Sequence, residues 1–353
     1  MSEPVCIALD AMGGDHGPDV VIPAAFRVLD VHPHLHVVLV GDESSLAAKI
    51  RAGGYEQAQR RRARIRHASQ IVEMNDPVAE ALRRKKDSSM RVAVNLVKAG
   101  EAGACVSAGN TGALMATARF VLKTLPGIDR PAICTEIPGM YGSVHMLDLG
   151  ANIDSSAEHL LQFAYMGAEL VSAVDGIAKP KVVLLNIGHE DIKGNDTVKA
   201  AARLLEISDL NYRGFVEGHD VFLSDVDIVV SDGFAGNVAL KTAEGVARFI
   251  GKKLKAELTQ GIYNRVAGWV AAPVLKGFYK QLDPRRYNGA SLLGLRGIVV
   301  KSHGSADRLA YAHAIELAMR EVEKAVPSRI RERLKARAHD AQNALAESSP
   351  AHT

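Results

Sequence analysis

The sequence predicts an α/β fold of three layers, in which a mostly parallel, doubly wound sheet lies between two layers of helices. Short apolar runs rich in Val, Ile and Leu alternate with alanine-rich stretches of helical pattern, as in repeated strand and helix units. The runs are continuously apolar, which indicates strands buried on both faces. With 353 residues, 47% of them apolar and 24% charged, the chain can build a large core.

Each predicted strand is followed within a few positions by glycine and polar residues. In chain order the runs end at Asp10, Val40, Ser107, Asp148, Asn186, Ser231 and Lys301. In open α/β sheets, ligands bind outside the carboxyl ends of the strands. We therefore expect these strand ends to form one shared site.

Helix boundaries follow from capping residues and prolines. The segment Asn75-Asp76-Pro77 predicts a helix start with a capping side chain ahead of a proline in the first turn. A helix over 316–326 is expected to end at Pro327. The predicted organisation is one two-lobed catalytic unit over 1–327, followed over 328–353 by a basic helix and a flexible tail. A solvated terminus explains that tail better than a nucleic-acid arm.

The composition and short motifs exclude several classes. Cys6, Cys105 and Cys134 lie in separate apolar runs without metal-ligand spacing, which indicates buried thiols in a reducing compartment. The thirteen histidines form no ligand cluster, so no metal site is expected. Neither a signal peptide nor a spanning run of about 18 apolar residues is present, and we expect a cytoplasmic protein.

Residues 251–286 differ in composition from the rest of the chain. They carry eight basic and two acidic residues, a charge of +6, so the remainder of the +3 chain carries −3. Apolar residues recur there at helical spacing, and Pro273 is expected to divide the segment into two helices. The stripe either packs in a dimer core or meets an acidic carrier protein or an anionic lipid surface. The candidate contact residues are Lys252, Lys253, Lys255, Trp269, Val270, Val274 and Phe278.

Common catalytic and nucleotide-binding motifs are missing. The loop after the first strand would need glycine where Met12 stands to match a dinucleotide fingerprint. Asp42 could imitate the ribose-binding acid, so nicotinamide binding is weakened and not eliminated. No G-x-x-x-x-G-K-[ST], G-x-S-x-G or H-E-x-x-H motif occurs.

Two strand-end loops have the composition of an anion site. Ser107 to Ala113 joins a strand to a helix with glycines that permit close backbone approach, which fits either a phosphate cradle or an ordinary capped turn. Ser231 to Asn237 repeats this arrangement. In a third loop, Lys193 either pairs with a neighbouring acid on the surface or faces an anionic substrate.

Seven short motifs follow one another between Asp10 and Gly304. They are Ala11-Met12-Gly13-Gly14-Asp15, Gly41-Asp42-Glu43, Ser107 to Ala113, Asp148 to Asn152, Asn186 to Gly194, Asp232 to Asn237, and Asn288 to Gly294 with His303-Gly304. In kind and order they closely resemble the motifs of the bacterial phosphate acyltransferase (PlsX) family. This order of motifs covers more than four-fifths of the chain.

The resemblance implies acyl transfer from acyl-(acyl carrier protein) to inorganic phosphate, giving acyl phosphate for phospholipid synthesis. It also implies a fold similar to isocitrate and isopropylmalate dehydrogenases and to phosphotransacetylase, and a homodimer. Lys193 and Asn237 match the positions to which the family's catalysis is attributed. The expected partners are acyl carrier protein, a second copy of the chain, and an anionic membrane surface or a membrane-bound downstream acyltransferase. Neither a cofactor nor nucleic acid is expected, and the location is cytoplasmic with peripheral membrane association.

Phosphate is an oxyanion near neutral pH, so the expected reaction needs no serine or cysteine nucleophile. Lys193 would offset negative charge, and the Asn237 amide would donate a hydrogen bond to phosphate or to the tetrahedral oxyanion. The residues expected to hold phosphate or substrate are Gly13, Gly14, Gly109, Asn110, Thr111, Gly112, Gly233 and Gly236. Bare carboxylates would repel phosphate, so other polar residues are expected to orient the loops: Asp10, Asp15, Asp148, Asn152, Asp232 and His303.

Two other classes remain open at this point. A nicotinamide-dependent dehydrogenase of similar fold would respond to NAD, against which the broken fingerprint argues. A non-catalytic membrane-binding or carrier-binding module would bind through 251–286 and release no thiol.

Overall fold

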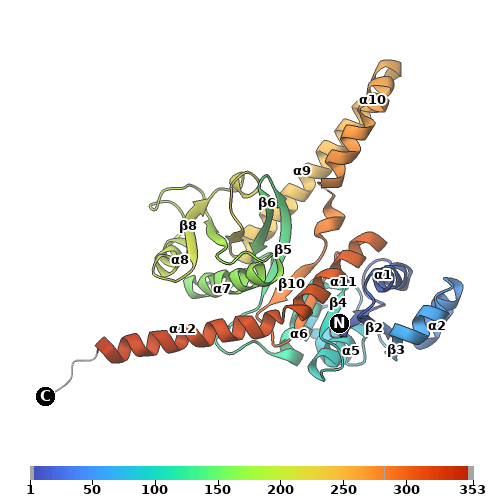
Figure 1. Cartoon of the computed structure of the whole chain (residues 1–353), viewed down its shortest axis with the longest axis horizontal. Coiled ribbons are helices and arrows are strands. Elements are labelled where there is room, and N and C mark those ends of the chain that lie inside the picture. Colours follow the sequence, from blue (N-terminus) through green and yellow to red (C-terminus); the bar gives the residue numbers. More distant parts are fainter. Residues whose placement is uncertain (1–3, 282, 349–353) are drawn as a thin grey trace.

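The computed structural model describes residues 4–281 and 283–348, which form one sheet with helices packed on both faces (Figure 1). The predicted α/β class is confirmed. Within the described residues the strands are β1 (Val5–Asp10), β2 (Leu35–Gly41), β3 (Ala63–His67), β4 (Ala104–Ser107), β5 (Ala132–Gly139), β6 (Gly142–Leu147), β7 (Lys181–Leu185), β8 (Asn211–Val216), β9 (Ile228–Val230), β10 (Ala290–Leu293) and β11 (Ile298–Lys301).

The sheet has the order β3-β2-β1-β4-β11-β10-β5-β6-β9-β7-β8. The five strands from β3 to β11 run parallel, and we call them the first half-sheet. The four strands from β6 to β8 are also mutually parallel and form the second half-sheet. Between them, the pairings of β11 with β10, β10 with β5 and β5 with β6 are all antiparallel. These three reversals make the second half-sheet run opposite to the first.

Helices fill most of the connections between strands. They are α1 (Pro18–Val31), α2 (Glu43–Ala52), α3 (Glu56–Arg62), α4 (Val78–Arg84), α5 (Ser89–Lys98), α6 (Thr111–Leu122), α7 (Ala157–Val174), α8 (Asp196–Glu206), α9 (Gly233–Thr259), α10 (Gly261–Gln281), α11 (Arg308–Glu323) and α12 (Val326–Ser348), with short 3₁₀ turns η1 (Asp220–Phe222) and η2 (Pro284–Tyr287).

Alternation along the strands divides the first half-sheet between two cores. Ile7 and Leu9 of β1 are buried in the core formed with α1 and α11. Ala8, between them, is buried in the core on the opposite face, which includes side chains of α5 and α6. Because successive strand residues point to opposite faces, both layers of helices take apolar residues from the same strand. This explains why the runs are continuously apolar.

The second half-sheet is covered unequally. Leu147 of β6 and Val230 of β9 face the core made with α7 and α8. Met146 and Val229 face the other side, where Ala239 and Leu240 from the first turns of α9 pack partly buried. The start of α9 is therefore anchored on the sheet.

Beyond those first turns, α9 and α10 form a hairpin that projects from the rest of the molecule (Figure 1). The prediction that Pro273 divides the two helices of this hairpin is wrong. Pro273 lies inside α10, and the chain turns instead at Gln260 and at Gly261, whose φ is +69°. The asparagine side chain of Asn264 ties the turn by donating from Nδ2 to the Glu257 carbonyl at 2.9 Å. A positive φ favours glycine, so Gly261 was the stronger break signal.

The carboxyl-terminal helices also differ from expectation. α11 ends at Glu323, before Pro327, and the chain turns at Ala325, whose φ is +50°. Pro327 instead occupies the first turn of α12, where its missing N–H leaves no helical bond unmade. Val326, Ile330 and Leu334 of α12 are buried in the α7 core. Residues 349–353 of the predicted flexible tail lie outside the described residues.

The predicted cap of α4 is absent from the structure. Pro77 takes the cap position and no side chain bonds to the helix start. Asp76 instead accepts a hydrogen bond from the Glu73 amide at 2.7 Å and pairs with the Lys85 ammonium at 2.5 Å. The aspartate thus closes the preceding turn.

Cys105 and Cys134 are buried, Cys6 is half-buried, and all three are free thiols. In the part of the chain that the structure describes, no helix is long and apolar enough to cross a bilayer. No group of three or more His, Cys, Asp or Glu side chains in that part is placed to hold a metal ion.

Candidate functional site

The strand-end loops form two clusters, one for each half-sheet. The loops after β1, β4 and β11 (residues 11–17, 108–112 and 302–305) surround Asp10, and we call them the Asp10 cluster. The loops after β6, β7 and β9 (residues 148–153, 186–194 and 231–237) form the Asp148 cluster. The two half-sheets run in opposite directions, yet the register brings their carboxyl ends together near the middle of the sheet. Lys301 at the end of β11 pairs with Ala290, Ala290 with Thr135, and Thr135 with Met146, one residue before the end of β6. The two clusters therefore face each other, and the expectation of one shared site stays a prediction.

Asp10 organises its cluster from a buried position. Its carboxylate is 1% exposed and accepts hydrogen bonds from the Met12 amide at 3.4 Å, the Gly13 amide at 3.2 Å and the Ser107 hydroxyl at 2.6 Å. The Ser107 hydroxyl in turn accepts a bond from the Gly109 amide at 3.1 Å. Burial raises the pKa of Asp10, and these donors oppose that shift. One side chain thus fixes the loops after β1 and β4.

The third loop joins through backbone contacts. The Asp15 amide donates to the Gly304 carbonyl at 2.9 Å, and the His303 amide donates to the Asn288 side-chain oxygen at 3.0 Å. Gly13 must be glycine here, because a Cβ would lie 2.5 Å from Oδ2 of Asp10. Predicted residues from all three loops are brought together.

Lys301, at the end of β11, is the residue that the sequence analysis missed as a site candidate. It is 8% exposed, and its ammonium donates to the Ala108 carbonyl at 3.1 Å and to the Ser302 carbonyl. Burial lowers the pKa of Lys301 to about 8, with Asp10 and Asp15 opposing the shift and Lys241 adding to it. The available signal was a lysine that directly closes an otherwise apolar strand.

The loop before α6 is a capped turn. The Asn110 side chain accepts from the Ala113 amide at 3.0 Å and donates to the Met74 carbonyl at 2.8 Å. No acceptor within the described residues takes the amides of Thr111 and Gly112. The cap and the predicted phosphate contact are therefore compatible, and the phosphate contact stays a prediction.

Asp148 holds the second cluster in the same manner. Its carboxylate is fully buried and accepts from the amides of Ile133 at 2.9 Å, Ala151 at 3.1 Å and Asn152 at 2.7 Å. The Asn152 side chain adds a fourth bond at 2.9 Å. Burial raises the pKa of Asp148, and the four donors counteract it. The loop after β6 is therefore fixed to the start of β5.

The glycines at the start of α9 are required by close packing. A Cβ on Gly236 would lie 2.0 Å from the Asp148 carbonyl oxygen, and one on Gly233 would lie 2.4 Å from that of Asn152. Their amides are also engaged, with Gly233 donating to Asn152 and Gly236 to Asp232. The Asp232 carboxylate caps the helix by accepting from the amides of Phe234 at 2.9 Å and Ala235 at 2.8 Å. The phosphate cradle expected here would have to break these bonds, and it stays a prediction.

The two predicted catalytic side chains follow adjacent strands: Lys193 lies in the loop after β7, and Asn237 lies on α9, which follows β9. Asn186 holds the Lys193 loop by donating from Nδ2 to the carbonyls of Gly188 at 3.1 Å and Lys193 at 3.3 Å. The Lys193 side chain is exposed and forms no ion pair within residues 4–281 and 283–348, so the expected surface pairing is not observed there. Asn237 is exposed on α9, and its side chain lies beside Gly150. A Cβ added at Gly150 would lie 3.6 Å from the Asn237 Cγ.

One face of α9 runs from the Asp148 cluster to the Asp10 cluster. Asn237, Lys241, Glu244 and Arg248 recur at three- and four-residue spacing, so they share that face. Glu244 bridges Lys241 at 3.0 Å and Arg248 at 3.5 Å. After burial, Lys241 is the next cause that lowers the pKa of His303, so α9 comes close to the loop after β11. The helix spans the two clusters.

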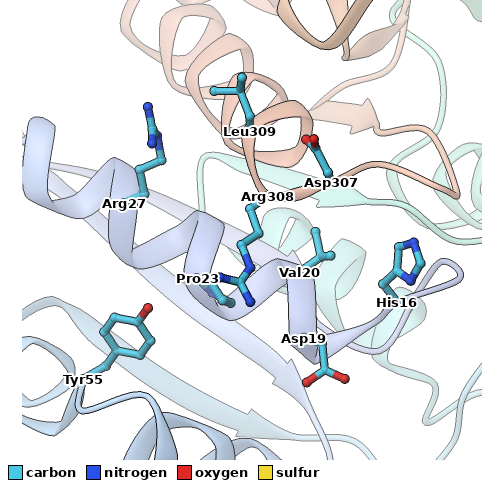
Figure 2. A pocket seen from close by; sticks show the side chains of 9 residues that line it. All are labelled: His16, Asp19, Val20, Pro23, Arg27, Tyr55, Asp307, Arg308 and Leu309. Atoms are coloured by element: carbon cyan, nitrogen blue, oxygen red, sulfur yellow. The ribbon is translucent and has the colours of Figure 1, made fainter.

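Asp42 has a structural role. It caps α2 by accepting from the Ser45 amide at 2.8 Å. A surface cavity of about 680 Å³ lies along α1 and the start of α11, where Arg308 reaches over α1 toward Pro23 (Figure 2). Neither Lys193 nor Asn237 lines it.

Comparison with known sequences decides the family. A family model described as "Fatty acid synthesis protein" matches residues 5–329. A phosphate acyltransferase of Methylococcus capsulatus is 60% identical over 93% of this chain and 96% of its own length. That of Halorhodospira halophila is 56% identical over 95% of this chain and 97% of its own length.

The chain belongs to the phosphate acyltransferase family. The resemblance inferred from the seven motifs is confirmed.

The solved structures with a fold similar to that of this chain include phosphotransacetylases. A phosphotransacetylase from Streptococcus pyogenes has a TM-score of 0.59 at 19% identity, covering 89% of this chain and 93% of that one. A 4-hydroxythreonine-4-phosphate dehydrogenase from Klebsiella pneumoniae has a TM-score of 0.51 at 14% identity, covering 92% and 99%. At these identities the likeness concerns the fold alone, and it agrees with the expected similarity to phosphotransacetylase.

Proposed function

We propose that this chain transfers a fatty acyl group from the thioester of acyl carrier protein to inorganic phosphate, forming acyl phosphate for phospholipid synthesis. The observation that carries the proposal is the 60% identity to a phosphate acyltransferase over nearly the whole chain. The activity is that of a transferase in lipid biosynthesis. Its substrates are the carrier thioester and phosphate, and the proposal includes no resident cofactor.

In the reaction, a phosphate oxygen attacks the thioester carbon and the carbonyl oxygen becomes an oxyanion. The carbon–sulfur bond then breaks, and the sulfur leaves with the bonding electrons as the carrier thiolate, which takes up a proton. Lys193 presents an exposed ammonium, and Asn237 on α9 presents an exposed amide, so both can donate to this oxyanion. Neither residue needs to form a covalent intermediate.

The activity is tested by supplying acyl carrier thioester with and without phosphate. Thiol release that requires phosphate, together with acyl phosphate formation, is the expected result. A module that only binds the carrier or a membrane would release no thiol. A thermal shift with NAD in the absence of both products would instead indicate the dehydrogenase alternative.

The α9–α10 hairpin is the surface proposed for the carrier or an anionic membrane. All seven candidate contact residues lie on it and are exposed, with Trp269 at 80% and Val274 at 75%. Charge reversal of Lys252, Lys253 and Lys255 should weaken binding to the carrier or to anionic vesicles at low salt. Unchanged binding would favour the other interpretation, in which the stripe packs between two copies of the chain. Light scattering on the same variants measures the proposed homodimer.

A further inference from the structure

Large apolar side chains stand exposed around the Asp148 cluster. Ile153 is 72% exposed, Ile187 77%, Ile192 79% and Phe234 65%. They belong to the loops after β6, β7 and β9, which are neighbours in the order β6-β9-β7. Ile192 directly precedes Lys193, so this apolar rim borders a residue proposed to act on the thioester.

The Asp10 cluster has a different surface. Its three loops, which the structure describes in full, contain no exposed large apolar side chain. Two exposed apolar residues from outside these loops, Met74 and Val78, are 42% and 40% exposed and pack beside Gly304 and Gly112. Basic groups gather there instead, since Lys301 is buried in the cluster and Lys241 approaches it from α9.

The acids beside these basic groups are already engaged by other donors. Asp10 already accepts three hydrogen bonds from its own loops, and Glu244 is shared between Lys241 and Arg248. Asp15 is the other acid that faces Lys301. Like charges held close together repel, and a bound anion among them removes that repulsion.

We propose that the two substrates occupy different clusters. Phosphate binds at the Asp10 cluster against Lys301 and Lys241, and the acyl chain lies on the rim formed by Ile153, Ile187, Ile192 and Phe234. This assignment rests on the proposed acyl transfer to phosphate. The two meet over α9, where Asn237 and Lys241 are one turn apart, about 6 Å along the helix. A phosphate oxygen held by Lys241 then faces the carbonyl carbon whose oxygen is bonded by Asn237.

The test measures phosphate affinity and acyl-chain preference separately. Lys241→Gln should raise the KM for phosphate about tenfold and leave the ratio of kcat/KM for palmitoyl and octanoyl carrier thioesters unchanged. The double variant Ile187→Ser, Ile192→Ser should lower that ratio about tenfold and leave the KM for phosphate unchanged. Lys179→Gln is the matched control for the lysine variant, because Lys179 is exposed and lies outside the two proposed sites. Met74→Ser tests the competing location for the acyl chain, because Met74 is an exposed apolar residue beside the Asp10 cluster.

Each alternative has its own result. A change of chain preference in Met74→Ser but not in the isoleucine variant would place the acyl chain at the Asp10 cluster and overturn the assignment. Loss of dimerisation in the isoleucine variant without a change of preference would make the rim a contact between two copies, which also overturns it. If the wild-type chain forms no acyl phosphate, the proposed function fails together with the assignment. All variants should keep the melting temperature, since the altered side chains are exposed.

Discussion

The Asp10 and Asp148 clusters are built by the same device and differ in what surrounds it. In each, a buried aspartate at the end of a strand collects the amides of its own loop and a donor from a neighbouring strand or loop. Basic groups surround the first cluster, and exposed isoleucines and a phenylalanine surround the second. The comparison teaches that the aspartates shape the loops, whereas the side chains around them determine which substrate each cluster can take.

The largest effect should come from the residues proposed to act on the oxyanion. Lys193→Ala and Asn237→Ala should each lower the phosphate-dependent kcat by about 10²–10³-fold, because each removes a donor that matters most in the transition state. Both side chains are exposed, so the melting temperature should not change. Steady-state kinetics and thermal unfolding check this. Unchanged turnover in either variant would show that the Asp148 cluster lacks the proposed chemistry.

The next largest effect should come from the two aspartates. Replacing either one by alanine leaves buried amides without an acceptor, at a cost of about 3 kcal/mol in the free energy of unfolding. The two losses should be similar, because Asp148 accepts four hydrogen bonds, and Asp10 accepts three and has the Ser89 hydroxyl as a further donor. Urea unfolding measures both.

The asparagine variants Asp10→Asn and Asp148→Asn serve as controls, since each keeps one acceptor oxygen and should lose less stability. If alanine at either position unfolded no more easily than asparagine, the shared device would not be what fixes these loops.

The smallest effect concerns pH and should separate the two clusters. Burial lowers the pKa of Lys301 to about 8, so the ammonium is charged below that pH and loses its proton above it. The KM for phosphate should therefore rise a few-fold as the pH passes 8, while acyl-chain preference stays constant. The charged groups that face Lys301 are Asp10, Asp15 and Lys241. Lys301→Met should remove the pH dependence; if the dependence persisted, another group would be responsible.

The α/β class and the strand ends were predictable because continuous apolar runs followed by glycine are typical of strands buried between two layers of helices. Ile7-Ala8-Leu9 shows the reason, since its residues enter two cores at once. The direction of the strands was not predictable. β10 is a run of four residues whose antiparallel pairing leaves no mark in its own composition, yet with β5 it reverses half of the sheet.

The candidate site, like the fold, could be predicted only in part from the sequence. The loops that contain Gly109, Lys193 and Asn237 could be recognised from their motifs. The engagement of the Gly233 and Gly236 amides could not, because it depends on contacts with Asn152 and Asp232 that form only in the fold. Lys301 also escaped detection, since a lysine at the end of an apolar run normally extends its charged end into solvent.

The length of α9 determines how far the acyl phosphate would have to move from Asn237 to a membrane at the tip of the hairpin. From Asn237 to Thr259 the helix rises about 33 Å, so the tip of the hairpin stands far from the proposed site of chemistry. A bilayer's hydrocarbon core is about 30 Å thick and holds two acyl chains end to end, so this is roughly twice the length of one chain. With only the tip of an upright hairpin on a lipid surface, acyl phosphate could not keep its reactive end at Asn237 while its tail entered the bilayer. Delivery would then require the product to leave the protein first or the hairpin to lie along the surface.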